Sequence, residues 1–291
     1  MNVNNEESSR ISFAAIAMEQ KNNNEVSLKS LSGARDTIFL LGSIVGQMCS
    51  IFLNVPHDSI ECTERPSLND DPFWLEESEG KNEVATQLGK VFIQLFATAS
   101  VCGIDLCTSI LKKVELNGRK YPVDLCKVCF HCCKYMVIFG FGAHCTLLTT
   151  TVHIYHQGKS GKYTNYSAQT GITTTEGQST IDSPTKAASS EMEDTTTVEG
   201  ITYLIRHFAN ARLWNRFHTP RNIALALLGE VGELAELFQW KGDVGEIELT
   251  EEELDKIGQE IADVSIYLIR LADVCHIRLG EKTMQLLNSK S

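Results

Sequence analysis

Apolar residues recur every three or four positions along the last third of the chain, from Val198 onward. This period places them on one face of a helix, whereas the side chains of a strand alternate with a period of two. Three consecutive segments show the helical period: residues 201–213, 220–238 and 254–271. No alternating strand pattern lies between them. The pattern therefore predicts an all-α module of three or four helices, packed as a four-helix bundle.

The two longer segments carry helix start signals. Pro220 suits the first turn of a helix, where its missing N–H is not needed, and Thr219 before it can act as the N-cap. Thr250 opens the sequence Thr-Glu-Glu-Glu, a capping box in which the first and fourth side chains bond each other's backbone N–H groups. Two long helices are therefore predicted, one starting at Pro220 and one directly after Thr250.

The first half of the chain repeats part of this pattern. A shift of 186 residues places Val45-Gly46 on Val231-Gly232, and a shift of 173 residues places residues 101–106 on residues 274–279. Two matches in the same order favour a duplicated helical module, although amphipathic helices also resemble one another by chance. We therefore predict two tandem modules.

Composition divides the chain further. The N-terminus is rich in Asn, Ser and Glu, and a Thr-rich stretch before Val198 nearly lacks large apolar side chains, which is typical of a linker. The five predicted segments are a disordered N-terminus 1–30, a first helical module 31–127, a cysteine-rich apolar insert 128–157, a linker 158–197 and a second helical module 198–291.

Acidic residues lie at three-residue spacing on both predicted long helices: Glu230 and Glu233 on the first, Glu260 and Asp263 on the second. Residues three apart on a helix are surface neighbours. Four carboxylates converging on an apolar seam would have raised pKa values unless a cation is present, and Mg²⁺ prefers oxygen ligands and bridges carboxylates to phosphates. The alternative interpretation is an acidic, solvated helix face.

Three segments of the second module carry a resemblance to a known family. Residues 214–222 read Trp-Asn-Arg-Phe-His-Thr-Pro-Arg-Asn, residues 229–240 contain Gly-Glu-Val-Gly-Glu, and residues 260–268 begin Glu-Ile-Ala-Asp. Together they resemble the MazG-like all-α nucleotide pyrophosphohydrolases, in particular the dCTP pyrophosphatase branch. The resemblance covers about residues 200–280.

The resemblance implies Mg²⁺-dependent hydrolysis of a nucleoside triphosphate, a dCTP-like pyrimidine, to the monophosphate and pyrophosphate. It also implies that the four acids bind Mg²⁺, while Glu236 or one of these ligands orients the attacking water. The residues implied to surround the nucleotide are Trp214, Asn215, Arg216, Phe217, His218, Trp240 and Tyr267. The family's histidine is Ile205 here, so we expect His207, two positions away, at the surface.

The first module is degenerate by the same comparison. It replaces Glu230, Glu233, Glu260, Asp263 and Tyr267 with Ile44, Gln47, Gln87, Lys90 and Gln94. Residues 113–122, however, resemble a segment that helps the family hold phosphates, and the second module lacks it. Either this segment completes the second module's site in an internal pseudo-dimer, or it is a relic. The competing function is therefore a catalytically impaired interaction or regulatory protein.

Charge and cysteine usage limit the partners and the compartment. The chain has 37 acidic and 26 basic residues and a net charge of −11, which disfavours nucleic-acid binding. Half of the ten cysteines lie within residues 126–145, and no secretory signal peptide is apparent. We expect a cytoplasmic protein with reduced thiols, a nucleoside triphosphate as substrate, and either a homo-oligomer or an internal pseudo-dimer.

The insert 128–157 allows several interpretations. Its cysteines have ligand-like spacing for zinc, and residues 136–154 are nearly long enough to cross a bilayer, although polar residues dilute that stretch and make a membrane segment the weaker choice. A lineage-specific insert is a further alternative. Deleting the 30 residues joins Lys127 to Gly158 in a sequence that resembles the uninterrupted family tail. Because the insert also begins with Val and ends with Gln, a retained intron is the favoured interpretation.

Overall fold

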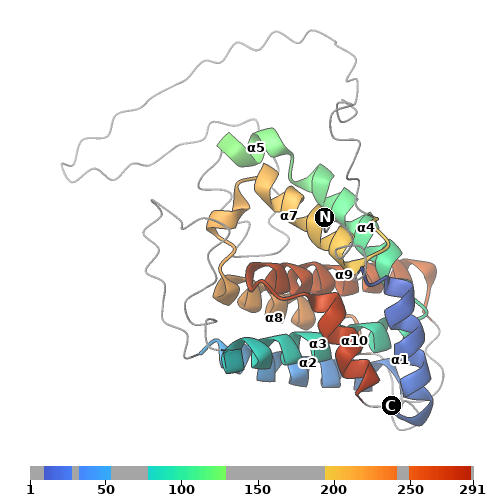
Figure 1. Ribbon diagram of the computed structural model, residues 1–291. Coiled ribbons are helices and arrows are strands. Elements are labelled where there is room, and N and C mark those ends of the chain that lie inside the picture. The colour runs from blue at the N-terminus through green and yellow to red at the C-terminus, as the bar shows by residue number, and fades with distance from the viewer. Residues whose placement is uncertain (1–9, 28–32, 54–77, 129–193, 241–248, 290–291) are drawn as a thin grey trace, which may run out of the picture. The chain divides into compact units, whose positions relative to one another are not determined.

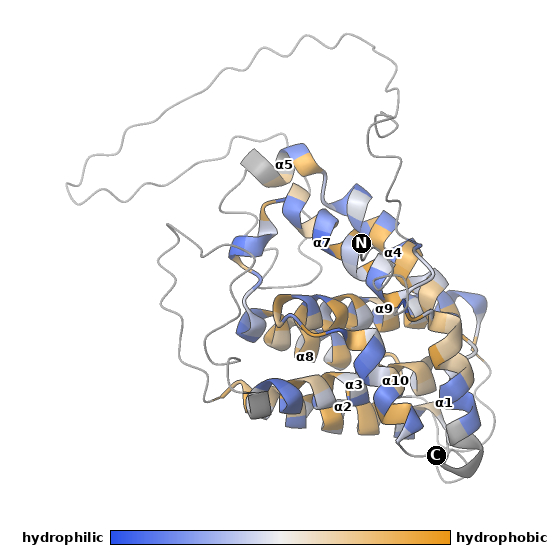
Figure 2. Cartoon of the chain, viewed as in Figure 1, coloured by the Kyte–Doolittle hydropathy of each residue, from blue (hydrophilic) through white to orange (hydrophobic). Residues whose placement is uncertain are grey.

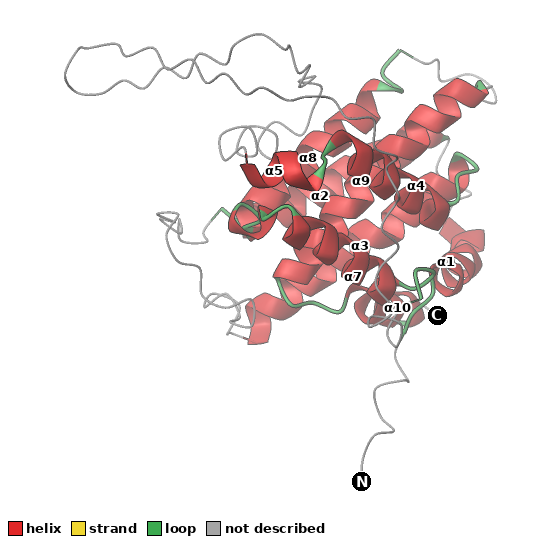
Figure 3. Cartoon of the chain, turned by 90° about the horizontal axis from the view of Figure 1, so that it is seen from above, coloured by secondary structure: helices red, strands yellow, loops and turns green. Residues whose placement is uncertain are grey.

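Amphipathic segments fold as helices throughout the described part of the chain. The computed structural model describes residues 10–27, 33–53, 78–128, 194–240 and 249–289. In these residues every regular element is a helix, joined to the next by a loop (Figure 3), which confirms the all-α prediction. The elements are α1 (Phe13–Ser27), α2 (Ala34–Ile51), α3 (Ser78–Val101), α4 (Leu106–Lys120), α5 (Val123–Val128), α7 (Val198–Ala211), the 3₁₀ helix η4 (Trp214–Arg216), α8 (Pro220–Glu236), α9 (Glu251–Val274) and α10 (Leu279–Asn288).

The described helices belong to one compact unit, which comprises Met1–Phe141 and Glu193–Ser291. The other unit, Gly142–Met192, lies outside the described residues. The same is true of nearly all of the insert 128–157 and of the linker 158–197, so the zinc, membrane and intron interpretations concern residues that the structure does not describe.

The predicted starts of the two long helices are confirmed. The Thr219 side chain accepts a hydrogen bond from the backbone N–H of Asn222, 3.2 Å away, and Pro220 occupies the first turn of α8. At the start of α9, Thr250 and Glu253 form both halves of the capping box. Because these caps satisfy N–H groups that have no partner within the helix, each start is fixed locally.

Helices α2, α3, α8 and α9 form the core of the described unit. Helix α2 packs on α3 and α8 packs on α9, and the two pairs meet through α2 with α8 and α3 with α9 (Figure 1). Figure 2 shows hydrophobic residues along all four helices. The fully buried side chains include Leu41, Leu88, Leu95, Leu227, Leu234, Ile261 and Leu268. Burial of such residues is the main stabilising contribution to the bundle.

The remaining helices cover this core. Helix α4 and helix α7 pack on α9, while α10 packs on α3 and α1 contacts both α3 and α10. Residues Gly80–Val101 of α3 are long and apolar enough to cross a membrane by length and composition, but 61% of their most apolar window is buried inside the protein. Packing against α2, α9 and α10 therefore accounts for the apolar character of α3.

The expected disorder of residues 1–30 does not hold for Phe13–Ser27, which form α1. Phe13 and Ile16 are buried, and the ring of Phe13 lies 5.8 Å from the ring of Phe92 in α3. The polar composition hid this helix because only two anchoring side chains are needed, and their partners are far away in the sequence.

Candidate active site

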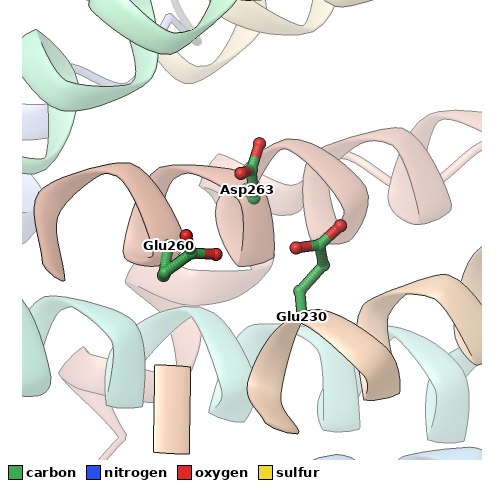
Figure 4. A group of neighbouring side chains, drawn as sticks. All are labelled: Glu230, Glu260 and Asp263. Atoms are coloured by element: carbon green, nitrogen blue, oxygen red, sulfur yellow. The ribbon is translucent and has the colours of Figure 1, made fainter. Parts of the chain in front are cut away.

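Helices α8 and α9 bring three of the predicted acids together. Glu230 points from α8 toward α9, where Glu260 and Asp263 lie (Figure 4). One carboxylate oxygen from each residue lies within 4.8 Å of the others. Glu233 is not part of this close group. The predicted convergence of acids on the seam between the two long helices is therefore realised by three of the four residues.

Burial and mutual repulsion shift the ionisation of these carboxyls. Burial, together with Asp263, Glu260 and Glu233, raises the pKa of Glu230 to about 9. Burial and the carboxylate of Glu260 raise the pKa of Glu233 to about 7. The pKa values of Glu260 and Asp263 are also raised, with burial as the main cause. Such shifts show that the charged forms lack sufficient compensation.

The cluster fits a hard divalent cation. Glu230 Oε2 and Glu260 Oε2 are buried and have no hydrogen-bond partner among the described residues. Buried carboxylate oxygens without a partner are costly, whereas cations such as Mg²⁺ and Ca²⁺ take oxygen ligands at such positions. Glu230, Glu260 and Asp263 therefore supply a suitable donor set for one ion.

Helix α4 places positive charge against the same acids. The Lys113 ammonium lies 2.5 Å from a carboxylate oxygen of Asp263, and the two side chains are only 15% and 12% exposed. Burial lowers the pKa of Lys113, but attraction to Asp263 outweighs burial and raises it overall. Lys112 pairs with Asp255 one turn away, so α4 is held on α9 at two points.

Two further polar residues of α4 face the cluster. The Asn117 side chain hydrogen-bonds the carboxylate of Asp263, and the charge of Lys120 is close enough to act on Glu260 and Asp263. Helix α4 begins at a defined N-cap, where Asp105 accepts the backbone N–H of Thr108. The segment that resembles the family's phosphate-holding motif therefore lies at the acidic cluster.

A pocket extends from the acids to an aromatic wall. With its solvent-open mouth it has a volume of about 860 Å³, in the range of small-molecule sites. The Trp214 ring lies 5.4 Å from Tyr121, 5.7 Å from Phe208 and 6.0 Å from His218, measured between ring centroids. The lining residues are Lys113, Val114, Asn117, Lys120, Tyr121, Ile205, Phe208, Ala209, Trp214, His218, Glu230, Asp263, Ile266, Tyr267 and Arg270.

A buried arginine organises one side of this pocket. Arg270, 2% exposed, donates from Nε to His218 Nδ1 at 3.0 Å and from a terminal nitrogen to Asn215 Oδ1 at 2.7 Å, and it pairs with Asp273. A guanidinium only donates, so His218 Nδ1 must accept. The imidazole is therefore neutral and carries its proton on Nε2, which makes it a hydrogen-bond donor rather than an acceptor at that atom.

The structure separates the predicted substrate residues into two groups. Trp214, His218 and Tyr267 line the pocket, and Asn215 contacts it through Arg270. Arg216 lies over the ring of its neighbour Phe217, 4.9 Å from the centroid, and neither residue lines the pocket. The remaining predicted residues, Trp240 and Glu236, are exposed, Trp240 to 89%.

Sequence reasoning did not identify Arg270 and Phe208. Arg270 is a lone charged residue in the apolar run Ile266–Leu271, and that interruption of an otherwise buried stretch is the one signal it leaves in the sequence. Phe208 resembles any core aromatic of an amphipathic helix and leaves no signal. Ile205 does line the pocket, and His207 is exposed as expected.

The comparisons with known proteins agree with this geometry. The chain is 45% identical to dCTP pyrophosphatase 1 of Mus musculus over 95 residues, which are 32% of this chain and 56% of the relative. It is 51% identical to the Rattus norvegicus protein of the same name and 49% identical to the Homo sapiens one, each over 85 residues, 28% of this chain and 50% of the relative. The chain contains a dCTP pyrophosphatase-like region.

The dCTP pyrophosphatase-like region is a part of the molecule. The chain spans about half the length of the curated relatives that it matches. No protein-family model matches the chain. The similarity and the acid-lined pocket together provide the basis for a proposal about activity.

Proposed function

We propose that the chain is a Mg²⁺-dependent nucleoside triphosphate pyrophosphatase that converts a dCTP-like pyrimidine nucleotide to the monophosphate and pyrophosphate. The observation that carries the proposal is one pocket with three carboxylates and two lysines at one end and an aromatic wall at the other. The relatives' name, dCTP pyrophosphatase 1, supports the choice of reaction and base.

Each part of the pocket suits one part of this substrate. Lys113, Asn117 and Lys120 donate N–H groups, and lysine ammonium groups suit phosphate oxygens. Trp214 and Tyr121 offer ring faces to the base. Bound at Glu230, Glu260 and Asp263, Mg²⁺ would offset the charge of the phosphates and polarise the α-phosphorus.

The reaction requires an oriented water molecule. Glu236, or one of the four acids that include Glu233, orients the water and accepts its proton. The water oxygen bonds to the α-phosphorus while the bond from that phosphorus to the bridging oxygen of the β-phosphate breaks, so that pyrophosphate leaves. Glu233 lies beside the cluster with a pKa of about 7, so it can exchange a proton near neutral pH.

Pyrophosphate release from dCTP by the purified chain tests this function. We expect Mg²⁺-dependent release that falls by about 100-fold or more in Glu233→Gln. Glu252→Gln is the matched control, because Glu252 lies in the first turn of α9 and its side chain is 79% exposed. Equal release by wild type and Glu233→Gln would reject the enzyme and favour the interaction or regulatory protein.

A further inference from the structure

Helices α2, α3 and α4 correspond to α8, α9 and α10 in length and spacing. Helix α3 and helix α9 each contain 24 residues, and α9 begins and ends 173 positions after α3. Helix α4 starts at Leu106 and α10 at Leu279, again 173 positions apart. The same interval at three boundaries indicates two copies of one arrangement.

The turns after α3 and α9 also match. Gly103 has φ +68° and His276 has φ +52°, both in the left-handed region. The next residue closes each turn in the same way, because Ile104 N–H bonds Ala99 O at 2.8 Å and Ile277 N–H bonds Ala272 O at 2.9 Å. A left-handed conformation is unfavourable for histidine, so its presence opposite Gly103 indicates a shared backbone plan.

Contacts between the two halves are reciprocal. Phe13 N–H bonds Thr196 O at 3.0 Å, and Val198 N–H bonds Ile11 O at 2.9 Å, across a bridge between Ser12 and Thr197. Likewise α4 of the first half packs on α9, and α10 of the second half packs on α3. Reciprocal contacts of this kind are what a two-fold axis between identical subunits produces.

We propose that this chain is an internal pseudo-dimer with one working nucleotide site, completed in cis by α4 of the first half, and that its second, equivalent site is closed. The proposal rests on the proposed function. In the working site, the second half supplies Glu230, Glu260 and Asp263, and the first half supplies Lys113 and Lys120. The two halves have thus lost different parts of an originally repeated site.

The equivalent site cannot hold the same ligand. Ile44, Gln87 and Lys90 replace the three acids, and Leu286 stands where the other site has Lys113. Leu286 packs against Gly89, where an added Cβ would lie 2.6 Å from Leu286 Cδ1. Side-chain carbon therefore fills the space that an ion and phosphates would need.

Gln94 shows the same change of role. It takes the place of Tyr267, yet its side-chain amide donates to the backbone oxygen of Thr37 at 3.0 Å and is 7% exposed. Gln94 thus ties α3 to α2. The first half therefore serves as a structural partner for the second, apart from the residues that α4 contributes.

Binding stoichiometry tests the proposal on the full chain. With Mg²⁺ and α,β-imido-dCTP, which resists cleavage, calorimetric titration should give one nucleotide per chain. Two nucleotides per chain would overturn the closed second site while leaving the proposed function intact. An absence of binding would instead reject the proposed function and this proposal with it.

The contribution of α4 is tested by two lysine variants in the first half. Lys120→Ala should weaken binding of the analogue by about tenfold or more, which is about 1.4 kcal/mol. Lys90→Ala is the matched control, because this exposed lysine stands at the position equivalent to Asp263 and should leave the affinity unchanged. Equal affinities for both variants and wild type would overturn the role of α4.

Mixing two defective chains decides whether α4 acts within its own chain. Glu230→Gln lacks an acid in the second half, and Lys120→Ala lacks a lysine in the first. If the site forms in cis, an equimolar mixture binds the analogue no more tightly than the better of the two variants alone. Recovery of wild-type affinity in the mixture would show that α4 reaches the site of another chain and would overturn the proposal.

Discussion

At the scale of single residues, the site consists of charges that burial has brought close together. Glu230 is 2% exposed and shares the space between α8 and α9 with two other carboxyls. Its pKa of about 9 means that it holds a proton at neutral pH unless a cation compensates it. Lys113 compensates Asp263 directly, so the acid with the greatest need for a further cation is Glu230.

The first prediction concerns stability and pH in the absence of divalent ions. The pKa of Glu230 rises from 4.5 to about 9 on folding, so the folded chain binds this proton more tightly than the unfolded chain. Stability from this proton is therefore complete below the lower value and is lost as the pH approaches the upper one. We expect Tm, measured with a chelator present, to fall from pH 5 to pH 9, by roughly 2–4 °C for each kcal/mol lost.

Glu230→Gln should flatten this dependence, because glutamine does not titrate. Mg²⁺ added at pH 9 should raise the Tm of the wild type and have less effect on the variant. A wild-type Tm that stays constant or rises between pH 5 and pH 9 would contradict the account of Glu230.

The second prediction concerns Arg270. Arg270→Ala leaves Asp273, 5% exposed, without its buried partner and releases the ring of His218. We expect a loss of about 3–5 kcal/mol in the free energy of unfolding, measured with urea. The control is Arg206→Ala, because Arg206 pairs with the same carboxylate but is 46% exposed, so its loss should cost under about 1 kcal/mol. Equal losses would show that burial does not decide the strength of this pair.

The residues that sequence could predict are those with a repeated chemical pattern. Glu230, Glu260 and Asp263 follow from helical spacing, because three-residue intervals fix which side chains share a face. Arg270 did not follow, because its partners His218 and Asn215 lie more than fifty positions away. The site role implied for Trp240 is not tested, and its exposure at the end of the described segment 194–240 leaves that role a prediction.

At the scale of elements, helix starts were predictable and long-range packing was not. Thr219 and Thr250 mark the starts of α8 and α9 because capping depends on residues three positions apart. Helix α1 was missed because it depends on contacts of Phe13 with α3. The place of α4 beside α9 was left open for the same reason, since it depends on the distant pair of Lys113 with Asp263.

The third prediction concerns the capping box of α9, the helix that carries Glu260 and Asp263. Thr250→Ala removes the acceptor for the backbone N–H of Glu253, 3.2 Å away. We expect a loss of about 1 kcal/mol in the free energy of unfolding. Thr250→Ser keeps the hydroxyl and should retain most of that stability. If both variants unfold at the same urea concentration as the wild type, the capping box does not stabilise α9.

At the scale of the whole molecule, the described helices combine parts of two repeated halves. The sequence suggested the repeat through short matches, and the equal intervals between helix boundaries support it. The second half keeps the acids and the first half keeps the lysines of α4. Because α4 packs on α9, one pocket receives both sets. Loss of each set from the opposite half then leaves one site complete.

The central claim is that this composite pocket hydrolyses dCTP between the α- and β-phosphates. Phosphorus NMR of dCTP incubated with Mg²⁺ and the full chain tests it most directly, because the products differ for each position of cleavage. We predict dCMP and pyrophosphate, formed at least about tenfold more slowly by both Glu230→Gln and Lys120→Ala. Formation of dCDP and phosphate, no turnover at all, or turnover that neither variant changes would contradict the claim.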